Sequence, residues 1–156
     1  MSRIDEEDLV LGAIAKIKAN YNTKIAAINA EKSDSATLKE LNSSAYYFID
    51  FPDAAPAYDP VLCYQIIVES TESPIQSSSA LITVGLLLTF ADELVADSDV
   101  TYQREARYRR ALKELIKENV APTFLGKIAD YPGLPRRING QNYYTAVVGF
   151  TMDMAN

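Results

Sequence analysis

Histidine and tryptophan are absent from this 156-residue chain, and Cys63 is its single cysteine. Without histidine, the chain has no Ser-His-Asp or Cys-His catalytic group, no imidazole metal ligand and no pH switch of the usual kind. One cysteine excludes an internal disulfide framework and fits a protein made in a reducing compartment. The chemistry left to the chain is that of carboxylates, lysine, tyrosine and the backbone, or none.

Long hydrophobic runs and an excess of basic residues are also missing. The longest nearly apolar run, residues 80–91, is far shorter than the roughly 20 residues that a membrane helix needs. The acidic N-terminus lacks the basic and apolar regions of a signal peptide. With 15 Lys and Arg against 21 Asp and Glu, the net charge is −6, which disfavours binding to nucleic-acid phosphates. The sequence therefore predicts a soluble protein made in the cytoplasm, without a membrane partner.

Length and apolar content predict one domain spanning residues 1–156. A chain of this size, with 48% hydrophobic residues, can bury a core large enough to fold without a metal or a disulfide. No Gly-rich phosphate loop of the Walker or GxGxxG type follows an expected strand. The acids between residues 92 and 99 lack the spacing and central glycine of a calcium-binding loop. We therefore expect no catalytic residue, no cofactor and no metal site.

Two segments have the spacing of amphipathic helices. In residues 4–30, apolar side chains recur every three or four positions, which predicts a helix with one buried stripe. That stripe consists of Leu11, Ile14, Ile17, Tyr21, Ile25 and Ile28. A second helix is expected over residues 100–120, with a stripe formed by Tyr108, Leu112, Leu115 and Ile116.

Four segments favour β-strands. Residues 46–51 are aromatic and are followed by three prolines, as expected of an edge strand and a rigid loop. Alternation of side chains then predicts strands over residues 61–69, 81–91 and 143–154. Residues 121–142 contain so many prolines and glycines that a long loop is expected there.

These elements predict an α+β fold with the order α-β-β-β-α-β. A mostly antiparallel sheet of about four strands would carry both helices on one apolar face. The strands on either side of residues 70–79 would pair antiparallel. The other face of the sheet is expected to meet water or a partner, and its side chains include Cys63, Gln65, Thr83, Thr89, Thr145 and Thr151.

The connection over residues 70–79 is longer than the two to five residues of a usual hairpin. Its serines cannot form a core, and one isoleucine stands among polar residues. We predict an assembly loop, with an ordinary surface loop as the alternative. Its contact residues would be Glu72, Pro74, Ile75 and Gln76.

Three arginines of the second expected helix, Arg104, Arg107 and Arg110, recur every three residues and share one side. Arg136 and Arg137 add positive charge later in the chain. Three interpretations remain open: a solvated helix face with ion pairs inside the chain, a basic patch that docks on an acidic surface of a neighbouring subunit, or a nucleic-acid site. We assign the five arginines to a candidate interface.

The helical sequence YQREARYRRALKELIKEN (residues 102–119), placed after a long apolar strand, and the closing YYTAVVGF (residues 143–150) resemble small neck proteins of tailed bacteriophages. In size and element order over most of its length, the chain is similar to the tail terminator family. The resemblance implies a non-enzymatic structural protein that forms a ring, commonly a hexamer, at the end of the tail tube. Such a ring ends tube growth and provides the surface to which the filled head attaches.

The resemblance also implies partners and a location. The partners would be further copies of the chain, the tail-tube protein, in some tails a sheath protein, and a neck or connector protein, with DNA passing through the ring without specific binding. The location would be the tail or neck of the virion, after synthesis in the host cytoplasm. Two alternatives stay open: a head-tail connector, adaptor or stopper of the neck, and, from another class, a small ligand-binding or nucleotide-binding enzyme.

Overall fold

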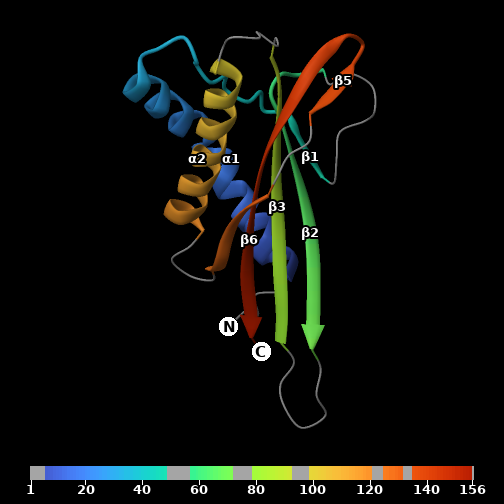
Figure 1. Ribbon diagram of the computed structural model, residues 1–156. Helices are drawn as coiled ribbons and strands as arrows, with labels where there is room; N and C mark the ends of the chain where they lie inside the picture. Colours follow the sequence, from blue (N-terminus) through green and yellow to red (C-terminus); the bar gives the residue numbers. More distant parts are fainter. Residues whose placement is uncertain are drawn as a thin grey trace.

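A computed structural model of the chain describes residues 6–48, 57–71, 79–92, 99–120, 125–131 and 135–155. Two helices lie on one face of a six-stranded sheet (Figure 1). The elements in chain order are α1 (Glu6–Lys32), β1 (Tyr46–Phe48), β2 (Val61–Thr71), β3 (Ser79–Ala91), α2 (Val100–Asn119), β4 (Leu125–Tyr131), β5 (Arg136–Ile138) and β6 (Gln141–Ala155). The expected α+β class and both expected helices are confirmed.

The sheet has the strand order β1-β2-β3-β6-β4, and β5 pairs with β6 outside this path. β2 and β3 pair antiparallel from Val61 opposite Thr89 to Thr71 opposite Ser79, which confirms the contact expected around residues 70–79. β1 lies at an edge, as expected, but pairs parallel with β2. The sheet is therefore mixed, although its other pairs are antiparallel.

The sheet is larger than the expected four strands because residues 121–142 include two strands. β4 is an edge strand whose register shifts between Leu125 and Lys127 at a β-bulge. β5 and β6 form a tight hairpin through Asn139 and Gly140, whose φ angles are 50° and 80°. Asn-Gly favours the two-residue type I′ turn, a hairpin signal that a count of prolines and glycines overlooks. The expected order α-β-β-β-α-β is thus wrong after α2, where three strands follow.

The core lies between the helices and the sheet. Even-numbered residues of β3 and β6 form its sheet side and are buried: Ile82, Val84, Leu86, Leu88, Phe90, Ala146, Val148, Phe150 and Met152. The stripe expected on α2 is confirmed, with burial of Tyr108, Leu112, Leu115 and Ile116.

α1 buries its expected stripe with one exception. Leu11 is 50% exposed, whereas Val10 is 3% exposed. Successive helix residues differ in direction by about 100°. Val10 therefore lies in the middle of the stripe that Ile14 and Ile17 define, and Leu11 lies at its border. The prediction that Leu11 is buried is wrong for this reason.

Residues 34–42, which we name the connecting segment, lie between α1 and β1 and have no regular secondary structure. Each of two asparagines of α1 both donates to and accepts from the backbone of one segment residue: Asn29 with Leu38 at 2.9 and 2.8 Å, and Asn22 with Leu41 at 3.2 and 2.8 Å. Seven helical residues and three extended residues both span about 10 Å. The segment therefore runs extended and antiparallel along α1.

Tyr21 of α1 is fully buried, and its hydroxyl has no hydrogen-bond partner within the described part of the chain. An unpaired buried polar group costs about 1–3 kcal/mol. We expect Tyr21→Phe to raise the free energy of unfolding by up to about 1 kcal/mol. The gain is smaller than the full cost of the unpaired hydroxyl, because removing the hydroxyl leaves a small cavity that is itself destabilising. Urea denaturation measures the change.

Tyr108→Phe is the matched control and should destabilise the protein, because the Tyr108 hydroxyl accepts a hydrogen bond from the Lys39 amide at 2.9 Å. Destabilisation by Tyr21→Phe would contradict the prediction.

Candidate interaction surfaces

Arg107 of α2 binds the connecting segment. Although charged, it is only 9% exposed. Its guanidinium donates to the two carboxylate oxygens of Asp34 at 2.7 and 2.6 Å and to the carbonyl of Ala36 at 2.7 Å. The hydrogen bond from Arg107 lowers the pKa of Asp34 to about 2. This pair fixes the start of the connecting segment against α2.

Arg104 ties the same segment to the end of β3. It donates from Nη1 to both carboxylate oxygens of Asp92 at 2.8 and 2.9 Å, and from Nε and Nη2 to the carbonyls of Thr37 and Ser35. Asp92 also accepts from the Thr101 hydroxyl at 3.0 Å. The side chains of Arg104 and Asp92 are 25% and 10% exposed, so this ion pair is largely shielded from water.

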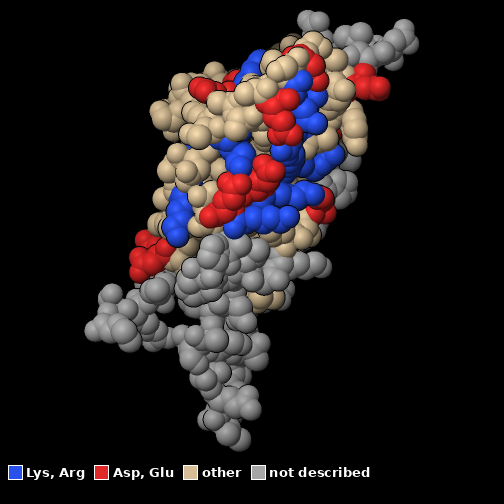
Figure 2. Space-filling view, turned by 90° about the vertical axis from the view of Figure 1, so that its left-hand side faces the viewer, with Lys and Arg blue, Asp and Glu red and all other residues tan. Residues whose placement is uncertain are grey.

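Arg110 completes the row. It contacts Glu31 of α1 at 2.7 Å and Glu114 at 3.1 Å. On this side of the molecule, basic and acidic side chains are interleaved rather than gathered into a patch of one sign (Figure 2). The structure thus shows all three arginines of the row paired within the chain. A contact of this row with a neighbouring subunit stays a prediction.

The other predicted interface residues lie on different elements. Arg136 and Arg137 are on β5, opposite Tyr143 and Asn142 of β6. Arg137 is exposed and Arg136 is half-buried. Four predicted contacts of the assembly loop lie outside the described residues: Glu72, Pro74, Ile75 and Gln76.

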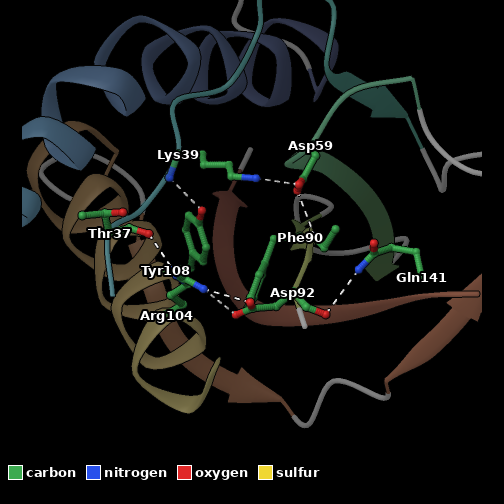
Figure 3. Close-up of a pocket in the computed structure, with 9 residues that line it drawn as sticks. Thr37, Lys39, Asp59, Phe90, Asp92, Arg104, Tyr108 and Gln141 are labelled. Atoms are coloured by element: carbon green, nitrogen blue, oxygen red, sulfur yellow. Dashed lines mark hydrogen bonds and ion pairs between the residues drawn. The ribbon is translucent and has the colours of Figure 1, made fainter. Parts of the chain in front are cut away.

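A polar cavity of about 290 Å³ opens where the connecting segment, α2 and the sheet meet (Figure 3). Its lining consists of Thr37, Lys39, Asp59, Phe90, Ala91, Asp92, Arg104, Tyr108 and Gln141. Its two cationic side chains are matched by its two carboxylates, so the lining carries no net charge that would favour an anion or a cation.

The charged groups of this cavity bond to one another. Asp59 accepts from Lys39 Nζ and from the Ala91 amide, both at 2.9 Å. Burial raises the pKa of Tyr108 to about 12, so its phenol stays protonated at neutral pH. The arrangement joins three parts of the fold.

Cys63 is 1% exposed. Across the described residues, no three Cys, Asp or Glu side chains gather in a way that could hold a metal ion. Neither of the two described helices is long and apolar enough to span a membrane.

The sheet face opposite the helices is covered at one end. Cys63 and Thr89, which were expected to meet water or a partner, are buried. Cys63 lies in register between the larger Tyr47 and Leu87, and Thr89 shares a 3.0 Å hydrogen bond with Thr145. The prediction is therefore wrong for Cys63 and Thr89. Other residues of this expected face are exposed or half-exposed: Gln65, Thr83, Thr145 and Thr151.

Exposed apolar side chains gather along one side of the sheet. Within the described chain, six large apolar side chains are exposed, and all but Tyr102 lie on or beside β2. We name this set the apolar edge: Leu11, Phe48, Ile67, Val68 and Leu81. None of these residues is among the predicted interface residues. The sequence of β2 does indicate exposed apolar residues. Neighbouring strand residues point to opposite faces, so Ile67 and Val68 cannot both face the core between the helices and the sheet.

Comparisons with known proteins give a weak similarity. No protein family matches the chain, and no curated protein matches its sequence. Among solved structures, a chain described as "Virion of native gene transfer agent (GTA) particle" has a TM-score of 0.38 and 10% sequence identity, over 91% of this chain and 98% of that chain. Values this low do not establish a common fold or function.

The Arg107–Asp34 pair predicts part of the acid sensitivity of the protein. The pKa of Asp34 is lowered from 3.8 to about 2 in the folded chain. Its stabilising effect is therefore present above about pH 4 and is lost as the pH falls through about 2. We expect the thermal unfolding midpoint of the wild type to fall more steeply over this range than that of Asp34→Asn. Glu40→Gln, at an exposed position, is the control and should follow the wild type. Parallel curves for wild type and Asp34→Asn would contradict the prediction.

Proposed function

We propose that this chain is a structural subunit of a phage-like virion, namely a tail terminator that forms a ring on the end of the tail tube. The observation that carries the proposal is the apolar edge, where five large apolar side chains are exposed on or beside one strand. Clusters of this kind mark contacts with other proteins. The resemblance of residues 102–119 and 143–150 to tail terminators suggests which assembly those contacts serve.

The paired charges support the same function. Ion pairs join α1 to α2 through Arg110 and Glu31, and join α2 to β4 through Lys113 and Asp130. A subunit held in this way presents its edges in one fixed geometry, as a closed ring needs. The proposed partners are further copies of the chain, the tail tube, in some tails a sheath, and a neck or connector protein.

Native mass spectrometry and particle imaging of the purified protein test this proposal. We expect a ring, with a hexamer favouring the terminator and a dodecamer favouring an adaptor beside the portal. Co-expression with the tail-tube protein should yield a complex that survives purification. A strict monomer at every concentration, together with no binding to tail tubes, would contradict both the terminator and the adaptor.

The DNA that passes through such a ring should not be held by it. The chain carries a net charge of −6, and attraction to phosphates at every step would slow transit. In a gel-shift measurement at about 0.15 M salt, we therefore expect only weak binding to duplex DNA. Tight binding that weakens steeply with added salt would contradict this prediction.

A further inference from the structure

The sheet ends in two edges that complement each other. We infer that copies of this chain join head-to-tail by strand addition, with the open edge of β2 in one copy paired to the outer edge of β4 in the next. The inference deepens the proposed function and rests on it, since it names the contact that would close the ring.

β2 has an open edge along its second half. β1 covers only the first part, where Tyr46 to Phe48 pair with Leu62 to Tyr64. Over residues 66–71, β2 pairs with β3 on one side and with no described strand on the other. Such an edge presents unpaired N–H and C=O groups that can template a further strand. Charged residues or proline usually protect these edges. In residues 66–71 the only charged residue is Glu69, and residues 66–68 are Ile, Ile and Val.

An apolar groove of about 320 Å³ lies beside this edge, on the helix side. It is lined by Val10, Leu11, Phe48, Tyr64 and Ile66, with Glu6 and Glu7. Phe48 is 57% exposed and Leu11 is 50% exposed. A strand added to β2 would therefore pair the open backbone and lie beside Leu11, Phe48, Ile67 and Val68 of the apolar edge, whereas Leu81 lies beyond β2 on β3. An occupant with basic charge would match the two glutamates.

The opposite edge of the sheet supplies such an occupant. β4 is seven residues long and is the last described strand on that side. Through β6 and β3, Leu125 lies level with Val68 of β2 and Ile128 lies level with Ile66. A rotation that keeps these levels would therefore bring the first half of β4 against residues 66–68. Lys113 of α2 binds Asp130 of β4 at 2.6 Å, which places this face of α2 beside β4. Lys117 is one helical turn further on, on the same face, and is exposed. Lys113 and Asp130 offset each other in charge, so Lys117 gives the described part of the β4 side a positive charge where the β2 side carries two acids.

Strand directions permit this contact in a ring. β4 is antiparallel to β6, β6 to β3, and β3 to β2, so β4 and β2 run in opposite directions. Rotation about an axis along the strands preserves their directions. β2 of one copy would therefore meet β4 of the next as an antiparallel pair, the commoner arrangement in sheets. Two unlike surfaces that meet in this way form a heterologous contact, which generates a closed ring when the rotation closes.

A charge-swap series tests the contact in the full-length protein. Glu6→Lys with Glu7→Lys reverses the charge beside β2, and Lys117→Glu reverses it beside β4; all three residues are exposed. Because like charges then face each other, we expect each variant to weaken assembly by at least about tenfold in native mass spectrometry and sedimentation. The variant with all three changes should recover assembly, since opposite charges meet again.

A matched aromatic pair tests the groove. Phe48→Asp places a carboxylate in the groove beside the two glutamates and should abolish the ring. Tyr102→Asp changes an equally exposed aromatic, at 65% against 57%, outside the apolar edge, and should leave the ring intact. Thermal unfolding of both variants checks that each one is folded. If Phe48→Asp does not fold, Phe48→Ala takes its place.

The outcomes separate this inference from the proposed function. A wild-type ring that persists in folded Phe48 variants and in the charge-reversed variants overturns the strand-addition contact but leaves the ring function standing. Loss of the ring in the Phe48 variant without recovery by the triple charge swap overturns the pairing of β2 with β4. A wild-type protein that never forms a ring, even with tail tubes, contradicts the proposed function itself. Capture of another protein's strand by β2 in a wild-type monomer also overturns the inference.

Discussion

The arrangement of this fold depends on how the connecting segment satisfies its backbone inside the protein. Side chains of the two helices, rather than a neighbouring strand, bond eight N–H and C=O groups of this segment. Asn22 and Asn29 act from α1, and Arg104, Arg107 and Tyr108 act from α2. Because buried backbone groups need partners, these five side chains allow the segment to enter the core. They also fix α1 against α2 and direct the chain into β1.

Periodicity predicts the parts of the fold whose partners are repetitive. α1, α2, β3 and β6 bury a regular stripe or face, so their spacing is enough to identify them. β2 is identified by its length and β-favouring residues, although its burial is not regular. The connecting segment has no period, since its partners are single side chains such as Arg107, 71 residues away from Ala36. β4 is hidden by its bulge, and β5 is too short to show alternation. Leu11 shows a related limit within α1, because a residue at the border of the stripe fits the three-to-four-residue spacing and is still 50% exposed.

For the candidate surfaces too, sequence spacing predicts which residues lie on one side of an element but not what they contact. Helical spacing predicts that Arg104, Arg107 and Arg110 share one side of α2. The same spacing fits arginines that pair with acids of their own chain and arginines that contact a neighbouring subunit. The structure supplies acids from α1, the connecting segment and the end of β3 as partners. The apolar edge escapes a sequence argument for the opposite reason. Alternation predicts which strand residues share a face, but exposure depends on what covers that face, and β2 runs past the helices (Figure 1).

The energy available at the apolar edge favours a closed ring over isolated pairs. Burying a large apolar side chain fully contributes about 1.5–3 kcal/mol. Leu11, Phe48, Ile67 and Val68 are 39–61% exposed, so burying them would contribute roughly 4 kcal/mol per contact. Association of two proteins costs an estimated 4–15 kcal/mol in lost freedom, which leaves a single contact marginal. In a ring, the last contact joins copies that are already held together, so it forms at a high effective concentration and without that cost. A subunit of this kind would pass from monomers to closed rings with few isolated pairs between them, and a tube end that gathers several copies would favour closure further.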